Sequence, residues 1–196
     1  MNSSFPTIMT VFDHRAAALE LILAYGYMVR FERICQRGSR LPARVKTAME
    51  CIYGAIHKLH QETRQVQERT QAVDARRSSC WGEPEEPRPT PILRKRGAIM
   101  TLDDHGAAAR ELGHAQRAVL RFLGIVSDRR HVPVRILDMA LQIENRIHAM
   151  CCAMDDLQFL TLRGEERNVP CWLGRFNQFD GEEAGSPDGP ILEEWK

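Results

Sequence analysis

The segment from Pro133 to Leu157 has the most regular apolar spacing in the chain, and it limits the possible folds more than any other feature. Apolar side chains recur there at alternating steps of three and four residues, which places them along one stripe of an α-helix. A second, adjacent stripe widens this face, as is typical of a helix buried against two partners in a bundle. The first stripe consists of Ile136, Ala140, Ile143, Ile147, Met150, Met154 and Leu157, and the second of Leu137, Leu141, His148 and Cys151.

Three other segments repeat this spacing and predict three further long helices. We expect them at about Asp13–Arg37, from Pro42 to about Ala75, and from Thr101 to Gly124. Thr101 starts a sequence close to a capping box, and glycines at 38, 124 and 164 are typical helix ends. The predicted core stripes are Ala17, Leu21, Ala24, Met28, Phe31 and Cys35; Val45, Met49, Ile52, Ile56, Leu59, Thr63, Val66 and Thr70; and Ala108, Leu112, Ala115, Val119 and Phe122.

A proline-rich stretch separates these helices into two pairs. Pro84, Pro87, Pro89 and Pro91 lie close together, and proline interrupts helical hydrogen bonding. The predicted fold class is therefore all-α, with two antiparallel helical hairpins that form either one helix bundle or two small lobes. The expected divisions are a basic hairpin lobe at 1–77, a linker at 78–98, a second hairpin lobe at 99–165 and an aromatic and acidic tail at 166–196. The helix–turn–helix layout occurs twice, but we expect no internal repeat at the level of residues.

Charge is distributed unevenly although the net charge is only +1. Lys and Arg outnumber Asp and Glu in the first half of the chain, whereas the charged residues from Asp180 to Lys196 are almost all acidic. A basic cluster is expected around the first helix–helix corner, where guanidinium groups suit the phosphates of acidic lipids or of a nucleic acid. An ordinary solvated arginine face explains the same residues equally well. The cluster consists of Arg30, Arg33, Arg37, Arg40, Arg44 and Lys46.

The tail combines apolar side chains with acidic ones, and this combination predicts a docking segment. Docking onto the basic corner of a neighbouring copy would give self-association into an oligomer or array, and folding back onto the chain's own bundle is the alternative. The residues concerned are Trp172, Phe176, Phe179, Ile191, Leu192 and Trp195.

The sequence lacks the familiar catalytic and nucleotide-binding motifs, so we expect no enzyme activity, no small-molecule substrate and no cofactor. His148, Cys151 and Cys152 have spacing that could hold a metal, with His57 and His60 completing a set. However, His148 and Cys151 also belong to an apolar stripe, so no metal site is predicted. The six cysteines are expected to be reduced thiols, and no apolar run is long enough to span a bilayer. Both features favour an intracellular protein, soluble or peripheral to a membrane.

These features resemble the matrix proteins of orthomyxoviruses, and in particular the compact matrix proteins of isaviruses. The resemblance rests on length, on two helical lobes joined at Pro84–Pro91, on the Arg30–Lys46 corner and on the lack of enzymatic motifs. It implies a structural protein in the virion interior that polymerises, binds acidic membrane and contacts ribonucleoprotein. An RNA-binding or host-antagonist viral protein and a cellular helical adaptor are the alternative functions.

Overall fold

The structure is a computed structural model that describes residues 9–37, 41–71, 99–127, 129, 132–164 and 172. These residues form four long helices and no strand, which confirms the predicted all-α class. The helices are α1 (Val11–Arg37), α2 (Ala43–Gln71), α3 (Leu102–Ser127) and α4 (Val134–Thr161). The predicted linker at 78–98 and nearly all of the tail lie outside the described residues.

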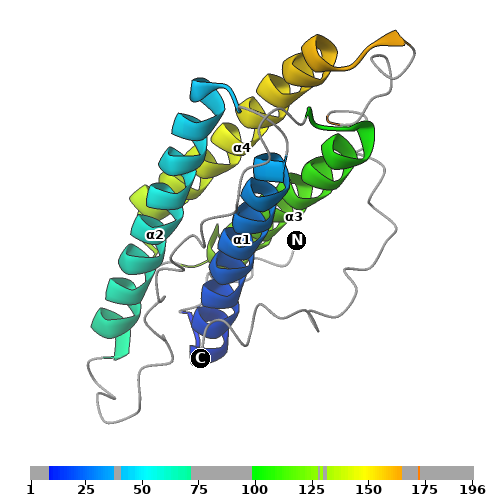
Figure 1. The fold of residues 1–196 in the computed structure, drawn as a ribbon. Helices are drawn as coiled ribbons and strands as arrows, with labels where there is room; N and C mark the ends of the chain where they lie inside the picture. Colours follow the sequence, from blue (N-terminus) through cyan, green and yellow to red (C-terminus); the bar gives the residue numbers. More distant parts are fainter. Residues whose placement is uncertain are drawn as a thin grey trace, which may run out of the picture.

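The four helices pack as one bundle around one hydrophobic core. α1 contacts α2 and α3, and α4 contacts α2 and α3, so the helices form a closed ring (Figure 1). The most extensive contact joins α1 to α3, where small buried residues such as Ala17, Ala24, Ala108 and Ala115 let the two helices approach closely. Of the two arrangements that the sequence left open, the described helices therefore form the single bundle.

All four contacts around the ring are antiparallel, and this fixes the chain path. Glu20 of α1 pairs with Arg121 of α3, whereas Arg30 pairs with Glu111, so α3 runs against α1. It follows that α2 and α3 run in the same direction, and the end of α2 lies at the opposite end of the bundle from the start of α3 (Figure 1). The connection from Gln71 to Leu102 therefore joins opposite ends of the bundle.

The predicted core stripes are confirmed almost throughout, because their described members are buried in a single cluster. Two predictions were wrong. Leu141 and His148, assigned to a second buried stripe, are exposed on α4, because α2 and α3 cover the neighbouring faces. α3 also continues through Gly124 to Ser127, because Val126 still packs in the core. Gly164 has a φ of 65°, but α4 already ends at Thr161 with an extended Leu162, so this glycine lies beyond the helix end.

The two hairpins are copies of each other, which corrects the expectation of no repeat. Residues 9–81 and 100–172 align without a gap, and many paired positions carry the same residue. Buried sites correspond as well, so the repeat is a repeat of packing and not only of composition. Identical pairs include Met9 and Met100, Thr10 and Thr101, Asp13 and Asp104, His14 and His105, Glu20 and Glu111, Arg30 and Arg121, Phe31 and Phe122, Gln67 and Gln158, and Trp81 and Trp172.

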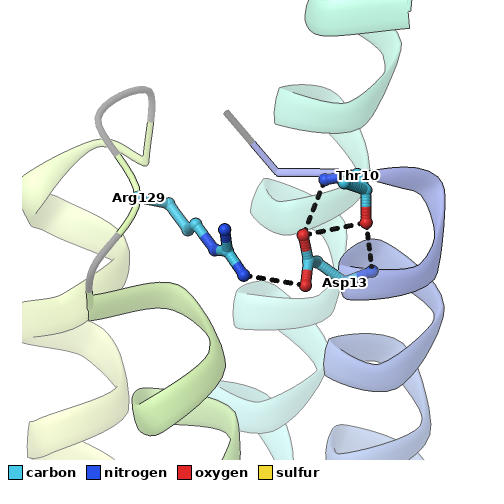
Figure 2. A network of polar contacts seen from close by, with 3 residues as sticks. All are labelled: Thr10, Asp13 and Arg129. Carbon is cyan, nitrogen blue, oxygen red and sulfur yellow. Dashed lines mark hydrogen bonds and ion pairs between the residues drawn. The ribbon is translucent and has the colours of Figure 1, made fainter. Parts of the chain in front are cut away.

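Both hairpins begin with the same capping arrangement. The Thr10 amide and hydroxyl donate to Asp13 Oδ2 at 2.7 and 2.9 Å, and the Asp13 amide donates to Thr10 Oγ1 at 3.2 Å (Figure 2). Thr101 and Asp104 repeat these bonds at 3.0, 2.9 and 3.2 Å. Such reciprocal bonds satisfy amides that a helix start otherwise leaves unpaired. Asp13 also accepts a bond from Arg129 Nη2 at 2.9 Å, which ties the start of α1 to the segment after α3 (Figure 2).

Candidate functional surface

The predicted basic cluster lies at the end of the bundle where α1 ends and α2 begins. Arg33, in the last turn of α1, and Lys46, in the first turn of α2, are both exposed. Arg40 and the side chain of Arg37 lie outside the described residues. This part of the surface therefore presents cations to solvent, as a phosphate-binding surface requires.

Arg30 and Arg44 make contacts within the chain that bear on their availability to a ligand. Arg30 Nε lies 3.8 Å from Glu111 Oε2, and its guanidinium lies over the Tyr27 ring, 5.0 Å from the centroid. Burial raises the pKa of Glu111, and Arg30 opposes this shift. Arg44 Nη2 contacts Asp156 Oδ2 at 3.3 Å, although both side chains remain more than half exposed. Arg30 thus helps to hold α1 on α3, and Arg44 stays accessible beside a carboxylate.

Exposed apolar side chains lie at the same end of the bundle. Phe159 and Leu160, near the end of α4, are 53% and 72% exposed. Together with Arg44, Asp155 and Asp156 they line an open hollow of about 520 Å³. Sequence reasoning missed both residues because they fall outside the core stripe of α4. We call Arg33, Arg44, Lys46, Phe159 and Leu160 the basic–apolar end.

The basic–apolar end combines residues of both hairpins, and the internal repeat shows which of them differ between the two copies. Phe159 and Leu160 of α4 occupy the positions that Glu68 and Arg69 hold in α2. Lys46 likewise corresponds to Leu137, and Arg33 to Gly124. The two copies thus keep the same core but differ at these four exposed positions, whereas Arg44 is matched by Arg135. A gapless comparison of the two halves would have identified these positions from sequence.

Trp172 was predicted to mediate self-association, with packing on the chain's own bundle as the alternative. It is fully buried within its own chain, in agreement with the alternative. Its ring packs edge-on against Phe31, with centroids 6.3 Å apart, and against His105 at 6.0 Å. Trp172 is therefore part of the hydrophobic core of the bundle. The other tail residues predicted for self-association, Phe176, Phe179, Ile191, Leu192 and Trp195, lie outside the described residues.

The histidine and cysteine residues considered for metal binding do not converge. Cys151 and His60 are buried, whereas His57, His148 and Cys152 are exposed. Burial raises the pKa of the Cys151 thiol, which disfavours the thiolate that a metal requires. Within the part of the chain that the structure describes, no three metal-binding side chains form a group. None of the described helices is long and apolar enough to cross a membrane.

Two buried histidines escaped sequence reasoning. His14 and His105 are equivalent in the repeat and fully buried, and neither ring nitrogen of His14 has a hydrogen-bond partner. His105 Nε2 lies 3.4 Å from Thr161 Oγ1. Burial lowers the pKa of both imidazoles, while the neighbouring Asp13 and Asp104 oppose the shift. They are neutral core groups at neutral pH, and a Thr-x-x-Asp-His sequence that occurs twice was the signal for them.

In comparisons with protein-family models, with curated proteins and with solved structures, none matches the chain.

Proposed function

We propose that the protein is a non-enzymatic assembly protein that attaches to an anionic membrane surface and associates with copies of itself, as the resemblance to viral matrix proteins implies. The observation that carries the membrane contact is the basic–apolar end, where exposed Arg33 and Lys46 lie at the same end of the bundle as exposed Phe159 and Leu160. Cations attract a surface of acidic headgroups, and apolar side chains insert between them.

This combination favours a bilayer over a nucleic acid as the anionic partner. Single-stranded RNA is bound by aromatic side chains interleaved with basic ones, so that bases can stack. At this end Phe159 is exposed, but it lies beside Leu160 and the carboxylates of Asp155 and Asp156. An aliphatic neighbour contributes to insertion into lipid but offers no face for stacking. The carboxylates repel the phosphates of lipids and of nucleic acids alike, so the preference for a bilayer rests on the apolar side chains.

Vesicle flotation tests the electrostatic part of the proposal. The full chain should float with vesicles that contain phosphatidylserine and remain at the bottom with neutral phosphatidylcholine. Reversing Arg33 and Lys46 to Glu should weaken binding by at least about 2 kcal/mol, or roughly thirtyfold, since each basic residue contributes about 1 kcal/mol near an acidic surface. Lys58→Glu is the matched control, because this exposed lysine lies roughly 18 Å further along α2.

The apolar part is tested with Phe159→Ser and Leu160→Ser, which leave the net charge unchanged. Both substitutions should reduce flotation, whereas Leu141→Ser should not, although Leu141 is an exposed leucine of the same helix. Flotation that ignores lipid charge would overturn the membrane proposal. So would a chain that retards RNA strongly at low salt but never floats, and that result would favour the RNA-binding alternative.

A further inference from the structure

The contact between the two hairpins has the features of an interface between two proteins. α1 makes its most extensive contact with α3 and a much smaller one with α2. The buried members of its stripe, including Met28 and Phe31, therefore require the second hairpin to exclude water. A hairpin that is separated from the other hairpin leaves a large apolar surface uncovered, and such a surface favours association.

Charged side chains fix the register of this contact. Arg121 Nε lies 2.9 Å from Glu20 Oε1, and the equivalent pair in the repeat, Arg30 and Glu111, lies at 3.8 Å. The glutamates are mostly buried, at 15% and 19% side-chain exposure, so like charges at these sites would be poorly screened. On the other side of the bundle, Arg44 pairs with Asp156, and Arg135 pairs with Glu62.

Chain connectivity does not require the two hairpins of one bundle to belong to one copy. The two hairpins are linked covalently by the stretch between Gln71 and Leu102. This stretch joins the end of α2 to the start of α3, at opposite ends of the bundle. Its extended reach is roughly 100 Å, whereas a helix as long as α1 spans roughly 40 Å. The link can therefore connect hairpins that lie in two neighbouring bundles, with every packing contact kept.

We propose that the protein associates by hairpin exchange, in which the α1–α2 hairpin of one copy packs on the α3–α4 hairpin of a second copy. The partner is thus another copy of this chain, and the interface is the α1–α3 and α2–α4 contact described above. The inference deepens the self-association part of the proposed function and does not involve the lipid contact. A closed dimer results when two copies exchange hairpins with each other. An open chain of copies results when the α1–α2 hairpin of each copy packs on the α3–α4 hairpin of the next.

Charge reversal of the full chain distinguishes exchange from other association. A fully reversed copy carries Glu20→Arg, Arg30→Glu, Glu111→Arg and Arg121→Glu, so its own bundle regains both ion pairs. Exchange with wild type, however, brings like charges together in both bundles. After incubation at high concentration, tagged wild type should capture untagged wild type. The captured complex should have about twice the mass of one chain. The captured amount of the fully reversed copy should be lower by at least about tenfold.

Two half-reversed copies provide the complementary measurement. One carries the substitutions at Glu20 and Arg30, and the other those at Glu111 and Arg121, so each meets like charges within its own bundle. Mixed together, they should form a species of doubled mass in light scattering, since exchange restores every pair. The proposal is overturned if wild type captures no wild type, if it captures the fully reversed copy equally well, or if the half-reversed copies stay separate. Failure here leaves flotation by the basic–apolar end unaffected.

Discussion

His14 and His105 follow the two capping aspartates, and both lie in the first turn of a helix with no exposed surface. A helix start carries partial positive charge, which disfavours a protonated imidazole. Burial acts in the same direction and lowers the pKa of both groups from the ordinary 6.5, with Asp13 and Asp104 opposing. The pKa of His60 is likewise lowered, to about 4, mainly by burial.

These shifts predict a stability that falls with acid. Protons bind the unfolded state more tightly, so the histidine contribution is fully present above about pH 6.5 and is lost as the pH falls through the lowered pKa values. Urea unfolding should give a smaller free energy of unfolding at pH 5 than at pH 7.5. His14→Gln should reduce that difference, whereas Gln142→Ala, at an exposed site that carries no titratable group, should leave it unchanged. An equal pH response in both variants would contradict the assignment to His14.

Core residues were predictable at this scale and the histidines were not. Leu21 or Ile143 reveals its burial through apolar neighbours at steps of three and four, because burial against one partner selects one stripe. His14 lies three residues before Ala17 and so continues the stripe of α1, but its polar side chain excludes it from a search for apolar residues. Whether a polar side chain on such a stripe is buried depends on long-range packing, which the local sequence does not specify. The same holds for Glu111, whose partner Arg30 comes from a distant segment.

The starts of α1 and α3 show how an element is defined by a few hydrogen bonds. Thr101 was recognised from sequence, whereas Thr10 was not, because the first helix was expected to begin at Asp13. In the structure, Asp13 is the third helical residue and its carboxylate closes the cap on Thr10. The Thr10 amide bond is the largest effect that lowers the pKa of Asp13. The carboxylate therefore stays ionised and remains a good acceptor.

Removing either cap should destabilise the bundle by a similar amount. Thr10→Ala and Thr101→Ala should each reduce the free energy of unfolding by about 1 kcal/mol, since each loses the hydroxyl that accepts an amide hydrogen. Thr→Ser at either site should retain most of that stability. Thr47→Ala, at an exposed site inside α2, serves as the control and should stay within about 0.5 kcal/mol of wild type in the same urea titration.

At the scale of the whole molecule, the four helices share one core, so the two hairpins should unfold together. Phe31 and Phe122 are equivalent in the repeat, and both are fully buried. Phe31→Ala and Phe122→Ala should each reduce the free energy of unfolding by about 3–5 kcal/mol, and both should shift the same single transition. Circular dichroism and tryptophan fluorescence would follow it in parallel. Two separate transitions, each sensitive to one variant, would contradict a single cooperative core.

The choice between one bundle and two lobes could not be made from the sequence. The apolar stripes of α1 and α2 show that each helix needs a partner, but not which one, and adjacency along the chain suggests α2 as the main partner of α1. The structure instead gives that role to α3. The repeat itself was legible in the residues, as Phe31 and Phe122 illustrate, but it emerges only when the two halves are aligned at one constant offset.

The pairing of α1 with α3 also sets the order of events during synthesis on the ribosome. The α1–α2 hairpin is complete at Gln71, but α3 is complete only at Ser127. At about 5–20 residues per second, several seconds separate these points. Throughout that interval the nascent hairpin has no companion from its own polypeptide, and the hairpins on adjacent ribosomes of one messenger are the nearest substitutes. Translation spacing should thus influence how many chains finish as separate molecules.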